Sequence, residues 1–523
     1  MPTITPCWGE RLLVDARIRM DLGKEFSDTL AFMPAVDLAR MIREKEISSV
    51  ELTRYFIDRI ERYDETINAV VVRDFDRALS AATRADEALM RCELFGPLHG
   101  LPMTVKEAYN VAGLPTTWGD PRFRDNTAVS DSAVVASYKG SGAHILGKTN
   151  VPILFRDAQS YNDIYGTTNN PWNLERTPGG SSGGSAAALA AGLTGLESGT
   201  DIAGSIRGPA HCCGVYGHKP TQGIVSREGF GALPPVVPDT VPAGLADRDL
   251  DVVGPLARSA EDLRLALDII AGPDRLDASG WRLELPAPRA QSLGNLRVAV
   301  WATDEMSRPG SAVTNRVQMI ADLLAKSGAQ VSDTARPNFS ARDSHYTYLN
   351  LLGSNSLADV SDEEFEQLRS FAQSFDADDM SFFSVIMRAA SLDHRSWDRH
   401  NKIRTEIRLH WKRFFEDWDI LICPTMVTTA SPHDHSPQPA RTILVDGTEA
   451  PYWDQIFWTA LASVAYLPST VFPTGPAPDG LPIGLQAIGA EFADRTTIEF
   501  AQLMAREVGG FRPPPSLGNE SST

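Results

Sequence analysis

Residues 177–221 read TPGGSSGGSAAALAAGLTGLESGTDIAGSIRGPAHCCGVYGHKPT. Two clusters rich in glycine and serine, residues 179–185 and 199–207, flank an apolar segment at 186–196. Alanine and leucine favour helix, so we expect a helix between two glycine-rich turns that meet at the same end of a buried element. Glycine lets backbone N–H groups approach a ligand closely, and serine supplies hydroxyl nucleophiles. The stretch therefore predicts a reaction centre rather than a pair of flexible linkers.

The stretch resembles the central segment of the amidase signature family, whose members hydrolyse amide bonds with a Ser–cis-Ser–Lys triad. The family pattern is GGSSGG, a helix and a GTD-x-GGS-IR run, and this chain reads GGSSGG at 179–184 and GTDIAGSIR at 199–207. The resemblance extends from about residue 35 to residue 506 through further motifs in the family's order: GLPMTVK at 100–106, GKTN at 147–150, NPWN at 170–173, GVYGHKPT at 214–221 and GLPIGLQ at 480–486. It implies an α/β fold, a single large domain whose mixed central β-sheet is covered by helices on both faces.

The resemblance also implies the roles of individual residues. By motif position, Ser205 is the nucleophile that forms an acyl-enzyme, Ser181 bridges through a cis peptide bond after Gly180, and Lys106 is the base. The implied oxyanion hole consists of the backbone N–H groups of Ile202, Ala203, Gly204 and Ser205. The residues expected to support the triad are Ser182, Thr200, Asp201 and Arg207. The residues expected to bind substrate are Gly180, Phe155, Arg156, Asp157 and Tyr161.

The relay from Ser205 through Ser181 to Lys106 makes a demand on the lysine. A serine hydroxyl is too weak an acid to ionise alone, so a neutral amine has to accept its proton and later return it to the departing amine. A lysine is neutral near pH 7–8 only if burial lowers its pKa by about 2–3. The apolar neighbours Leu101, Met103 and Val105 are consistent with such burial.

Two positions depart from the commonest family pattern. Glu107 follows the lysine where an aspartate is usual, and Ala203 stands where a glycine is common. Neither change removes a catalytic group. We expect the methyl group of Ala203 to narrow what fits beside the oxyanion loop.

Composition excludes several classes of function. The 523 residues include 49 Lys and Arg against 67 Asp and Glu, a net charge of −18 that disfavours nucleic acid as a partner. Five cysteines, an odd number, favour a reduced, cytoplasmic protein over a disulfide framework. The first residues lack the continuous apolar core of a signal peptide, and no apolar run reaches the roughly 18 residues of a membrane span.

Alternating helical and strand patterns predict the organisation of the chain. We expect a lead-in at 1–34, the amidase domain at 35–510 with a variable helical insertion at 338–415, and a flexible tail at 511–523. The lead-in would pack on the body or support an oligomer contact such as a homodimer. We expect the many aromatic side chains of residues 338–415 to form mainly core, with some of them lining the substrate pocket. The expected helices cover 35–42, 50–63, 77–92, 131–139, 314–326 and 494–508, and the expected strands 67–72, 104–106, 143–146, 296–301, 417–424, 471–473 and 483–488.

Three other motifs predict different chemistry and are outweighed by their context. Residues 142–149 fit the phosphate-loop pattern GxxxxGK[ST], but the variable positions read as a strand and no helix start follows. The 179–184 cluster fits GxSxG, but the preceding residues are loop-like and no histidine lies in a recognisable catalytic context. His433 and His435 are close in sequence but lack a second ligand cluster for a metal.

The leading interpretation is therefore an amidase that acts on small to medium carboxamides or anilides without a cofactor or a metal, with water as the second substrate. A carbamate (urethane) or ester hydrolase with the same triad stays open. A different class is the amidotransferase component that feeds ammonia to charged tRNA together with partner chains. A non-catalytic binding protein fits least, because all three triad positions are occupied. The sequence does not define the physiological substrate.

Overall fold

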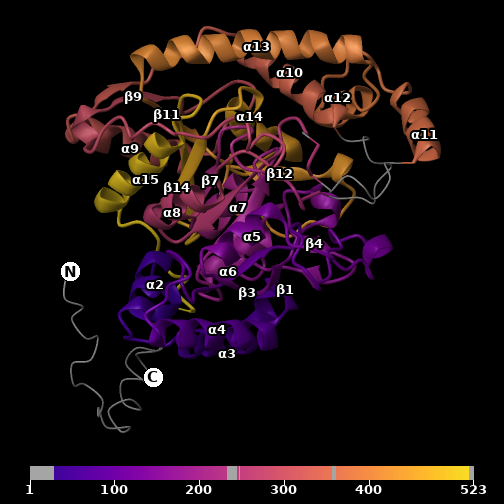
Figure 1. Ribbon diagram of the computed structural model, residues 1–523. Coiled ribbons are helices and arrows are strands. Elements are labelled where there is room, and N and C mark those ends of the chain that lie inside the picture. Colours follow the sequence, from indigo (N-terminus) through magenta and orange to yellow (C-terminus); the bar gives the residue numbers. More distant parts are fainter. Residues whose placement is uncertain (1–28, 232–243, 247, 356–360, 518–523) are drawn as a thin grey trace.

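The computed structural model describes residues 29–231, 244–246, 248–355 and 361–517. Its centre is an eight-stranded mixed sheet with the order β10-β9-β11-β15-β14-β7-β8-β6 (Figure 1). Strand β9 runs parallel to both β10 and β11, and the other neighbouring pairs are antiparallel. The strands are β6 Glu197–Asp201, β7 Tyr216–Lys219, β8 Val252–Ala257, β9 Arg297–Val300, β10 Gln330–Ser332, β11 Ile420–Pro424, β14 Ser469–Pro476 and β15 Pro482–Ile488.

A separate three-stranded sheet has the order β1-β3-β2, in which β2 runs parallel to β3 and β1 antiparallel to it. Its strands are β1 Val70–Arg73, β2 Pro102–Lys106 and β3 His144–Thr149. Two short hairpins complete the strands: β4 Tyr161–Asn162 with β5 Gly166–Thr167, and β12 Thr442–Val445 with β13 Thr448–Pro451.

Helices surround both sheets (Figure 1). The α-helices are α2 Ala35–Arg43, α3 Ser49–Ile67, α4 Phe75–Met90, α5 Ala133–Gly140, α6 Gly183–Ala190, α7 Arg207–Cys213, α8 Ala260–Ile270, α9 Ser311–Lys326, α10 Ala341–Ser354, α11 Asp362–Ala372, α12 Phe382–Ala389, α13 His394–Asp417, α14 Ile456–Val464 and α15 Asp494–Val508. The short 3₁₀ helices are η1 Leu30–Phe32, η2 Pro121–Phe123, η3 Ile153–Phe155, η4 Leu293–Asn295, η5 Gln438–Ala440 and η6 Tyr452–Gln455. The predicted α/β class, with a mixed central sheet between helices, is confirmed.

Local sequence accounts for the start and end of α3. The Ser48 hydroxyl accepts a hydrogen bond from the Glu51 N–H, and the Glu51 carboxylate accepts one from the Ser48 N–H, which is a capping box. The helix runs beyond the predicted residue 63 to Ile67, and Asn68 ends it with a φ of 56°. The predicted strand at 67–72 therefore begins later, with β1 at Val70.

The helix predicted at 186–196 is shorter and starts earlier than expected. Helix α6 covers Gly183–Ala190, and all of its residues are buried. Gly192 has a φ of 66°, a left-handed conformation that ends the helix although Ala and Leu continue beyond it. Small side chains let α6 lie in the core beside β2, β3, β6 and β8.

The second glycine-rich cluster is not a turn throughout, which corrects the prediction from its composition. Residues 197–201 form β6, which pairs with β8 from Glu197 opposite Leu256 to Asp201 opposite Val252. Ladder hydrogen bonds on a buried sheet compensate for the weak strand preference of glycine. The turn is confined to residues 202–206, between β6 and α7.

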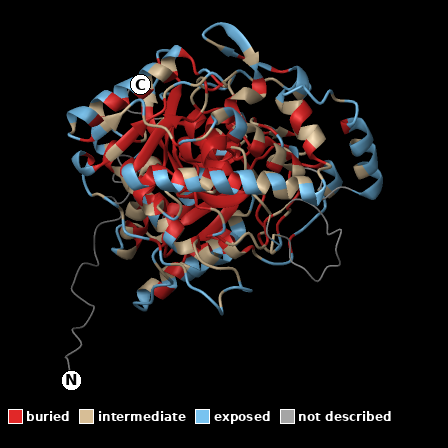
Figure 2. Cartoon of the chain, turned by 90° about the horizontal axis from the view of Figure 1, so that it is seen from above, coloured by how far each residue is buried: buried red, intermediate tan, exposed pale blue. Residues whose placement is uncertain are grey.

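Residues 338–415 are mostly helical, as expected, and form α10 to α13 above the large sheet (Figure 1). Many of their aromatic side chains are core residues, among them Tyr348, Trp411 and Phe415. Helix α13 extends to Asp417, so the strand expected at 417–424 begins at Ile420. Figure 2 shows that buried residues concentrate in the central sheet, while the surrounding helices present exposed faces to solvent.

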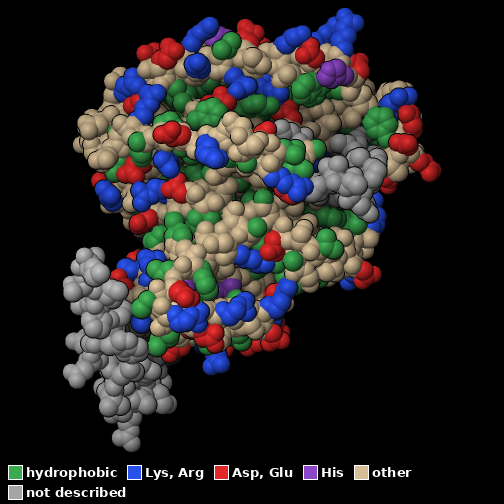
Figure 3. All heavy atoms as spheres, in the orientation of Figure 1, with side chains coloured by type: hydrophobic (Ala, Val, Ile, Leu, Met, Phe, Trp, Pro, Cys, Tyr) green, Lys and Arg blue, Asp and Glu red, His purple; other side chains and the backbone are tan. Residues whose placement is uncertain are grey.

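The ends of the described chain lie against the body. Most of the lead-in, residues 1–28, lies outside the described residues, as do residues 518–523 of the expected tail. Residues 511–517 contain no helix or strand, but the ring of Phe511 lies 6.2 Å from that of Phe32. This part of the expected flexible tail is therefore packed. On the face shown in Figure 3, basic and acidic side chains are interspersed rather than gathered in one patch.

Candidate active site

Lys106 is the last residue of β2 and is fully buried. Its Nζ donates hydrogen bonds to Ser181 Oγ over 2.6 Å and to Thr200 Oγ1 over 2.7 Å. Burial lowers the pKa of Lys106 from 10.5 to about 7, although the negative charges of Asp251, Asp201 and Glu197 act in the opposite direction. The lysine therefore contacts Ser181 and has a pKa close to neutral pH.

Ser181 precedes α6 in a segment with little free space. The Gly180–Ser181 peptide bond is cis, the isomer implied by the family resemblance. A Cβ atom on Gly180 would lie 2.5 Å from the carbonyl oxygen of Asp157, so only glycine fits there. The N–H of the next residue, Ser182, donates to the carbonyl oxygen of Ser205 over 3.1 Å. This bond joins the two serine-bearing segments.

Ser205 lies in the turn between β6 and α7, and the buried Asp201 carboxylate holds that turn. Asp201 accepts hydrogen bonds from the N–H groups of Gly204 over 2.8 Å and Ile206 over 3.1 Å. The Arg207 guanidinium donates to both of its carboxylate oxygens over 3.0 and 2.9 Å. Burial alone would raise the pKa of Asp201, but Arg207 outweighs it and holds the pKa at about 2.

The second half of the chain also supports the turn. Tyr348 of α10 donates its hydroxyl hydrogen to the carbonyl oxygen of Ile202 over 3.0 Å, and Thr459 of α14 donates to that of Ala203 over 3.0 Å. These two hydrogen bonds fix the carbonyl groups of the turn. Ile202, Ala203 and Ser205 lie along the wall of a cavity. The N–H of Gly204, the fourth residue of the expected oxyanion hole, is already donated to Asp201.

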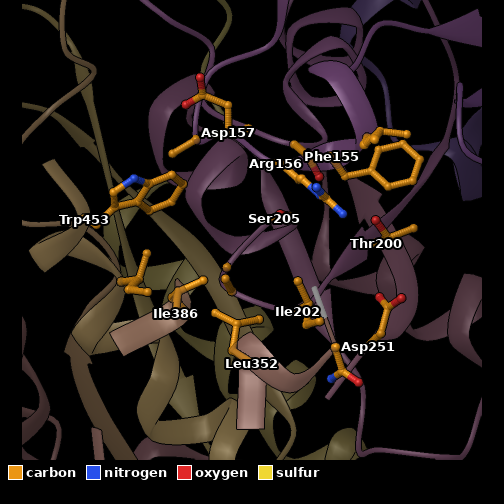
Figure 4. A pocket seen from close by; sticks show the side chains of 18 of the residues that line it. Phe155, Arg156, Asp157, Thr200, Ile202, Ser205, Asp251, Leu352, Ile386 and Trp453 are labelled. Carbon is orange, nitrogen blue, oxygen red and sulfur yellow. The ribbon is translucent and has the colours of Figure 1, made fainter. Parts of the chain in front are cut away.

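The cavity has a volume of 360 Å³, within the range of about 300–1,000 Å³ that is typical of small-molecule sites. Its wall includes Ser181, Thr200 and Ser205 together with Gly180, Phe155, Arg156 and Asp157. Figure 4 shows Ser205 at the centre, with Trp453 and Ile386 on one side and Thr200 and Asp251 on the other. The structure thus brings Ser181, Ser205 and most of the expected pocket residues to one cavity, while Lys106 is buried outside the cavity wall and reaches it through its bond to Ser181.

Tyr161 is the exception among the expected pocket residues, because it is not part of the cavity wall. Its hydroxyl oxygen accepts a hydrogen bond from Arg441 Nη2 over 2.7 Å, and its ring stacks on His435 with centroids 3.8 Å apart. Asp157 does border the cavity, and its carboxylate is bound by Arg441 Nη1 over 2.6 Å and by the Tyr452 hydroxyl over 2.9 Å. Arg441, which lies 280 residues from Tyr161 in the sequence, binds both the Tyr161 hydroxyl group and the Asp157 carboxylate. Tyr161 therefore helps to hold Arg441 in place and does not contact the cavity.

Sequence reasoning missed other parts of the wall. Asp251 immediately precedes β8 in the charged run RDLD at 248–251, which by itself reads as exposed loop. One oxygen of its carboxylate accepts a hydrogen bond from Arg227 Nη2 over 2.8 Å. Phe382 and Phe383 border the cavity, so residues 338–415 supply aromatic wall residues as expected, and Leu352 and Ile386 of the same region border it too. Nothing in the local sequence of Trp453 marks it as a pocket residue.

Glu107, the unusual residue after the lysine, points away from the triad. Its carboxylate accepts hydrogen bonds from the N–H groups of Thr117 over 2.6 Å and Trp118 over 2.9 Å, and it lies 3.7 Å from Lys148 Nζ. Burial raises the pKa of Glu107, while Lys148 opposes that effect. The carboxylate therefore holds the loop at 115–118 in place beside β3.

The competing motifs do not form the sites they would need. The phosphate-loop candidate contains β3, and its Lys148 is buried with Nζ donating to Thr116 Oγ1 over 2.8 Å. The residues before Gly180, 168–178, contain neither a helix nor a named strand, and no histidine is among the described residues of the cavity wall. In the described ranges no group of three or more His, Cys, Asp or Glu side chains is arranged to hold a metal ion. None of the described helices is long and apolar enough to span a membrane.

Comparison with known proteins agrees with this geometry. A family model described as Amidase matches residues 51–498. The chain is similar to an indoleacetamide hydrolase of Bradyrhizobium diazoefficiens, with 31% identity over 91% of this chain and 86% of the relative. It is also similar to the A component of the glutamyl-tRNA(Gln) amidotransferase of Acidothermus cellulolyticus, with 33% identity over 88% of this chain and 91% of the relative.

The fold is also similar to that of a bacterial aryl acylamidase of the amidase signature enzymes, with a TM-score of 0.74, 25% identity and coverage of 91% of this chain and 96% of the other. The sequence matches extend well beyond the triad motifs. Because the family model covers most of the chain, from residue 51 to residue 498, the protein belongs to the amidase signature family.

Proposed function

We propose that this amidase-family hydrolase cleaves the C–N bond of small to medium carboxamides or anilides through an acyl-enzyme on Ser205. The observation that carries the proposal is the contact of 2.6 Å between Lys106 Nζ and Ser181 Oγ, made by a fully buried lysine whose pKa burial lowers to about 7. A substantial fraction of such a lysine is neutral at physiological pH. It can therefore act as a base without a histidine.

In the first step neutral Lys106 takes a proton from Ser181, which takes one from the Ser205 hydroxyl. Ser205 Oγ attacks the carbonyl carbon, and the carbonyl oxygen becomes an oxyanion. We assign its stabilisation to the backbone N–H groups along residues 202–205. Asp201 engages the N–H of Gly204, so Ile202, Ala203 and Ser205 remain as the donors. A well-placed donor of this kind contributes about 2.7–4 kcal/mol to transition-state stabilisation.

The C–N bond then breaks, and the departing nitrogen takes the proton that Ser181 relays from Lys106. Water attacks the resulting ester and gives its proton to the same relay, which releases the carboxylic acid and restores Ser205. The remaining groups position the reacting ones: Thr200 binds Lys106, Ser182 ties its segment to Ser205, and Asp201 with Arg207 fixes the turn. No step requires a metal or a cofactor.

Carbamates and esters present the same carbonyl carbon to Ser205, so the relay would also cleave them. An amidotransferase component is the alternative of another class, and relatives of that kind are similar to this chain. A component that released ammonia from a zwitterionic amide such as glutamine would need charged partners along its pocket. The described cavity wall includes the ionisable residues Arg156, Asp157, Arg248 and Asp251, so its lining does not separate the two classes, and co-purification of partner chains is the observation that does.

We also propose a cytoplasmic location, because the buried Cys212, Cys213 and Cys423 form no disulfide bond. Cys7 lies outside the described residues. A homodimer formed through the lead-in at 1–34 stays a prediction.

The experiment that tests the function is a panel of acyl-anilides, primary amides, carbamates and esters with the parent and Ser205→Ala. We expect anilide or amide hydrolysis by the parent and a loss of several orders of magnitude in Ser205→Ala, with an unchanged circular dichroism spectrum. Ser185→Ala is the matched control, since Ser185 is a buried serine of α6 that bonds Thr149. Equal activity in Ser205→Ala would refute the proposal, and a preference for carbamates would move the function to that alternative.

A further inference from the structure

We propose that the acyl part of the substrate carries an uncharged aromatic or branched apolar group, which the cavity holds in an apolar lobe beside Ser205. This inference rests on the proposed function. We define the apolar lobe by six residues of the cavity wall: Leu352, Leu368, Phe382, Ile386, Trp453 and Ile456.

Packing against the protein core holds the residues of the apolar lobe in place. Its residues come from α10, α11, α12, η6 and α14. The side chains of Leu352, Phe382, Ile386 and Trp453 pack against the buried cluster of the second half of the chain and remain only partly buried themselves. A fixed apolar surface therefore faces the cavity, and an apolar group of the substrate would displace water from it.

Two rings give the apolar lobe a preference for aromatic groups. Phe382 and Trp453 are stacked, with centroids 4.7 Å apart and planes inclined by 20°. Such a pair offers a further ring both faces and edges at favourable distances. Because Phe382 belongs to α12 and Trp453 to η6, the pair also joins the two segments that form this side of the cavity.

None of the six residues of the apolar lobe is ionisable. The described cavity residues after residue 351 include Asn355 and Gln438 but no ionisable side chain. A carboxylate or ammonium group placed there would lose water without gaining a countercharge. Figure 4 places Asp251 on the side of Thr200 and Asp157 on the side of Trp453, where Arg441 and Tyr452 already bind the Asp157 carboxylate.

The position of the proton relay decides which end of the substrate enters the apolar lobe. Lys106 Nζ lies 2.7 Å from Thr200 Oγ1 and 4.9 Å from the ring centroid of Phe155. Figure 4 places Thr200 and Phe155 on the side of Ser205 opposite to Trp453 and Ile386. The leaving nitrogen has to lie near the relay that protonates it. The acyl part therefore extends the other way, into the apolar lobe.

The test is a series of 4-nitroanilides that differ only in the acyl group: acetyl, 3-phenylpropionyl, succinyl and 4-aminobutyryl. We expect kcat/KM for 3-phenylpropionyl to exceed that for acetyl by at least about a hundredfold, which is the factor for only two buried methylene equivalents at about tenfold each. We expect the succinyl and 4-aminobutyryl compounds to have lower kcat/KM values than the acetyl compound, because their charged ends find no partner in the apolar lobe. Equal rates across the series, or a charged acyl group as the best substrate, would overturn the proposal.

Ile386→Asp tests the apolar lobe itself. We expect at least about a tenfold rise in KM for the 3-phenylpropionyl compound, and an improved rate for the 4-aminobutyryl compound, whose ammonium group would then meet a carboxylate. Leu409→Asp is the matched control, because Leu409 lies on α13, is 49% exposed and is not part of the cavity wall. Phe382→Ala gives a second variant, which should lower the preference for 3-phenylpropionyl over acetyl by at least about tenfold.

Binding to Ser205→Ala separates this inference from the proposed function. Calorimetry should show tighter binding of 3-phenylpropionamide than of acetamide to Ser205→Ala, and this difference should disappear when Ile386→Asp is added. If neither compound is preferred, the apolar lobe does not select the acyl group, even if Ser205 hydrolyses anilides. If the preference is present but no amide is hydrolysed by the parent, the inference on binding holds and the proposed function fails.

Discussion

Replacing Lys106 by methionine should abolish activity and change how the stability of the protein depends on pH. The side chain is fully buried, and burial lowers its pKa from 10.5 to about 7. Between these two pH values the unfolded chain binds a proton that the folded protein does not. The free energy of unfolding of the parent therefore rises with pH across this window, and the rise ends above pH 10.5.

The size of the effect follows from the same two pKa values. Integrating the difference in bound protons from pH 7 to pH 10 gives a rise of roughly 3–4 kcal/mol that this one lysine contributes. Lys106→Met removes the contribution, while loss of the hydrogen bonds to Ser181 and Thr200 lowers stability equally at both pH values. Other buried lysines, Lys148 and Lys219, also have lowered pKa values but are common to both proteins.

The assay is urea unfolding of the parent and Lys106→Met at pH 7 and pH 10, monitored by tryptophan fluorescence. Lys402→Met is the control, because the Lys402 side chain is 76% exposed and its removal should leave the pH dependence unchanged. An identical pH dependence in the parent and Lys106→Met would show that Lys106 is not held neutral by burial. Lys106→Arg should also be inactive, since arginine stays protonated and cannot accept a proton from Ser181; near-parental activity at pH 8 would contradict the relay.

Three further expectations concern the surroundings of the triad. The negative charge of Asp251 raises the pKa of Lys106, so Asp251→Asn should move the acidic limb of the kcat/KM profile to lower pH, and an unmoved limb would contradict this. Arg441→Met leaves the buried Asp157 carboxylate without its cation and should cost about 3–5 kcal/mol in urea unfolding; a loss below about 1 kcal/mol would mean that water replaces the guanidinium. Dialysis against EDTA should leave kcat/KM unchanged, whereas a loss that zinc restores would point to a metal in the mechanism.

The sequence predicted the triad positions because their motifs are short and local. Residues 100–106, 179–184 and 199–207 each carry a pattern that needs no distant partner to be recognised. The structure places Ser181 and Ser205 on the wall of one cavity and Lys106 in contact with Ser181, while their catalytic roles stay predictions. The α/β class was also predictable, since alternating helix and strand patterns are a property of local sequence.

Other features depend on partners that lie far away in the chain. The resemblance places Tyr161 in the pocket, but Arg441 binds its hydroxyl group from 280 residues away. Asp251 reads as a loop residue until its position at the start of β8 is known. Residues 199–201 read as part of a glycine-rich turn, because only their pairing with β8 makes them a strand. Local sequence patterns cannot predict these contacts, because each joins residues that are far apart in the sequence.

The central claim is that Ser205 carries the acyl group, and trapping that intermediate tests it most directly. The parent would be mixed with an acyl-4-nitroanilide in excess, quenched in acid within the first turnovers and digested for peptide mass spectrometry. We predict an added acyl mass on the peptide that contains Ser205, and none on that peptide in Ser205→Ala. An acyl group on Ser181, Ser182 or Ser185 instead, or amide hydrolysis that persists in Ser205→Ala, would contradict the account.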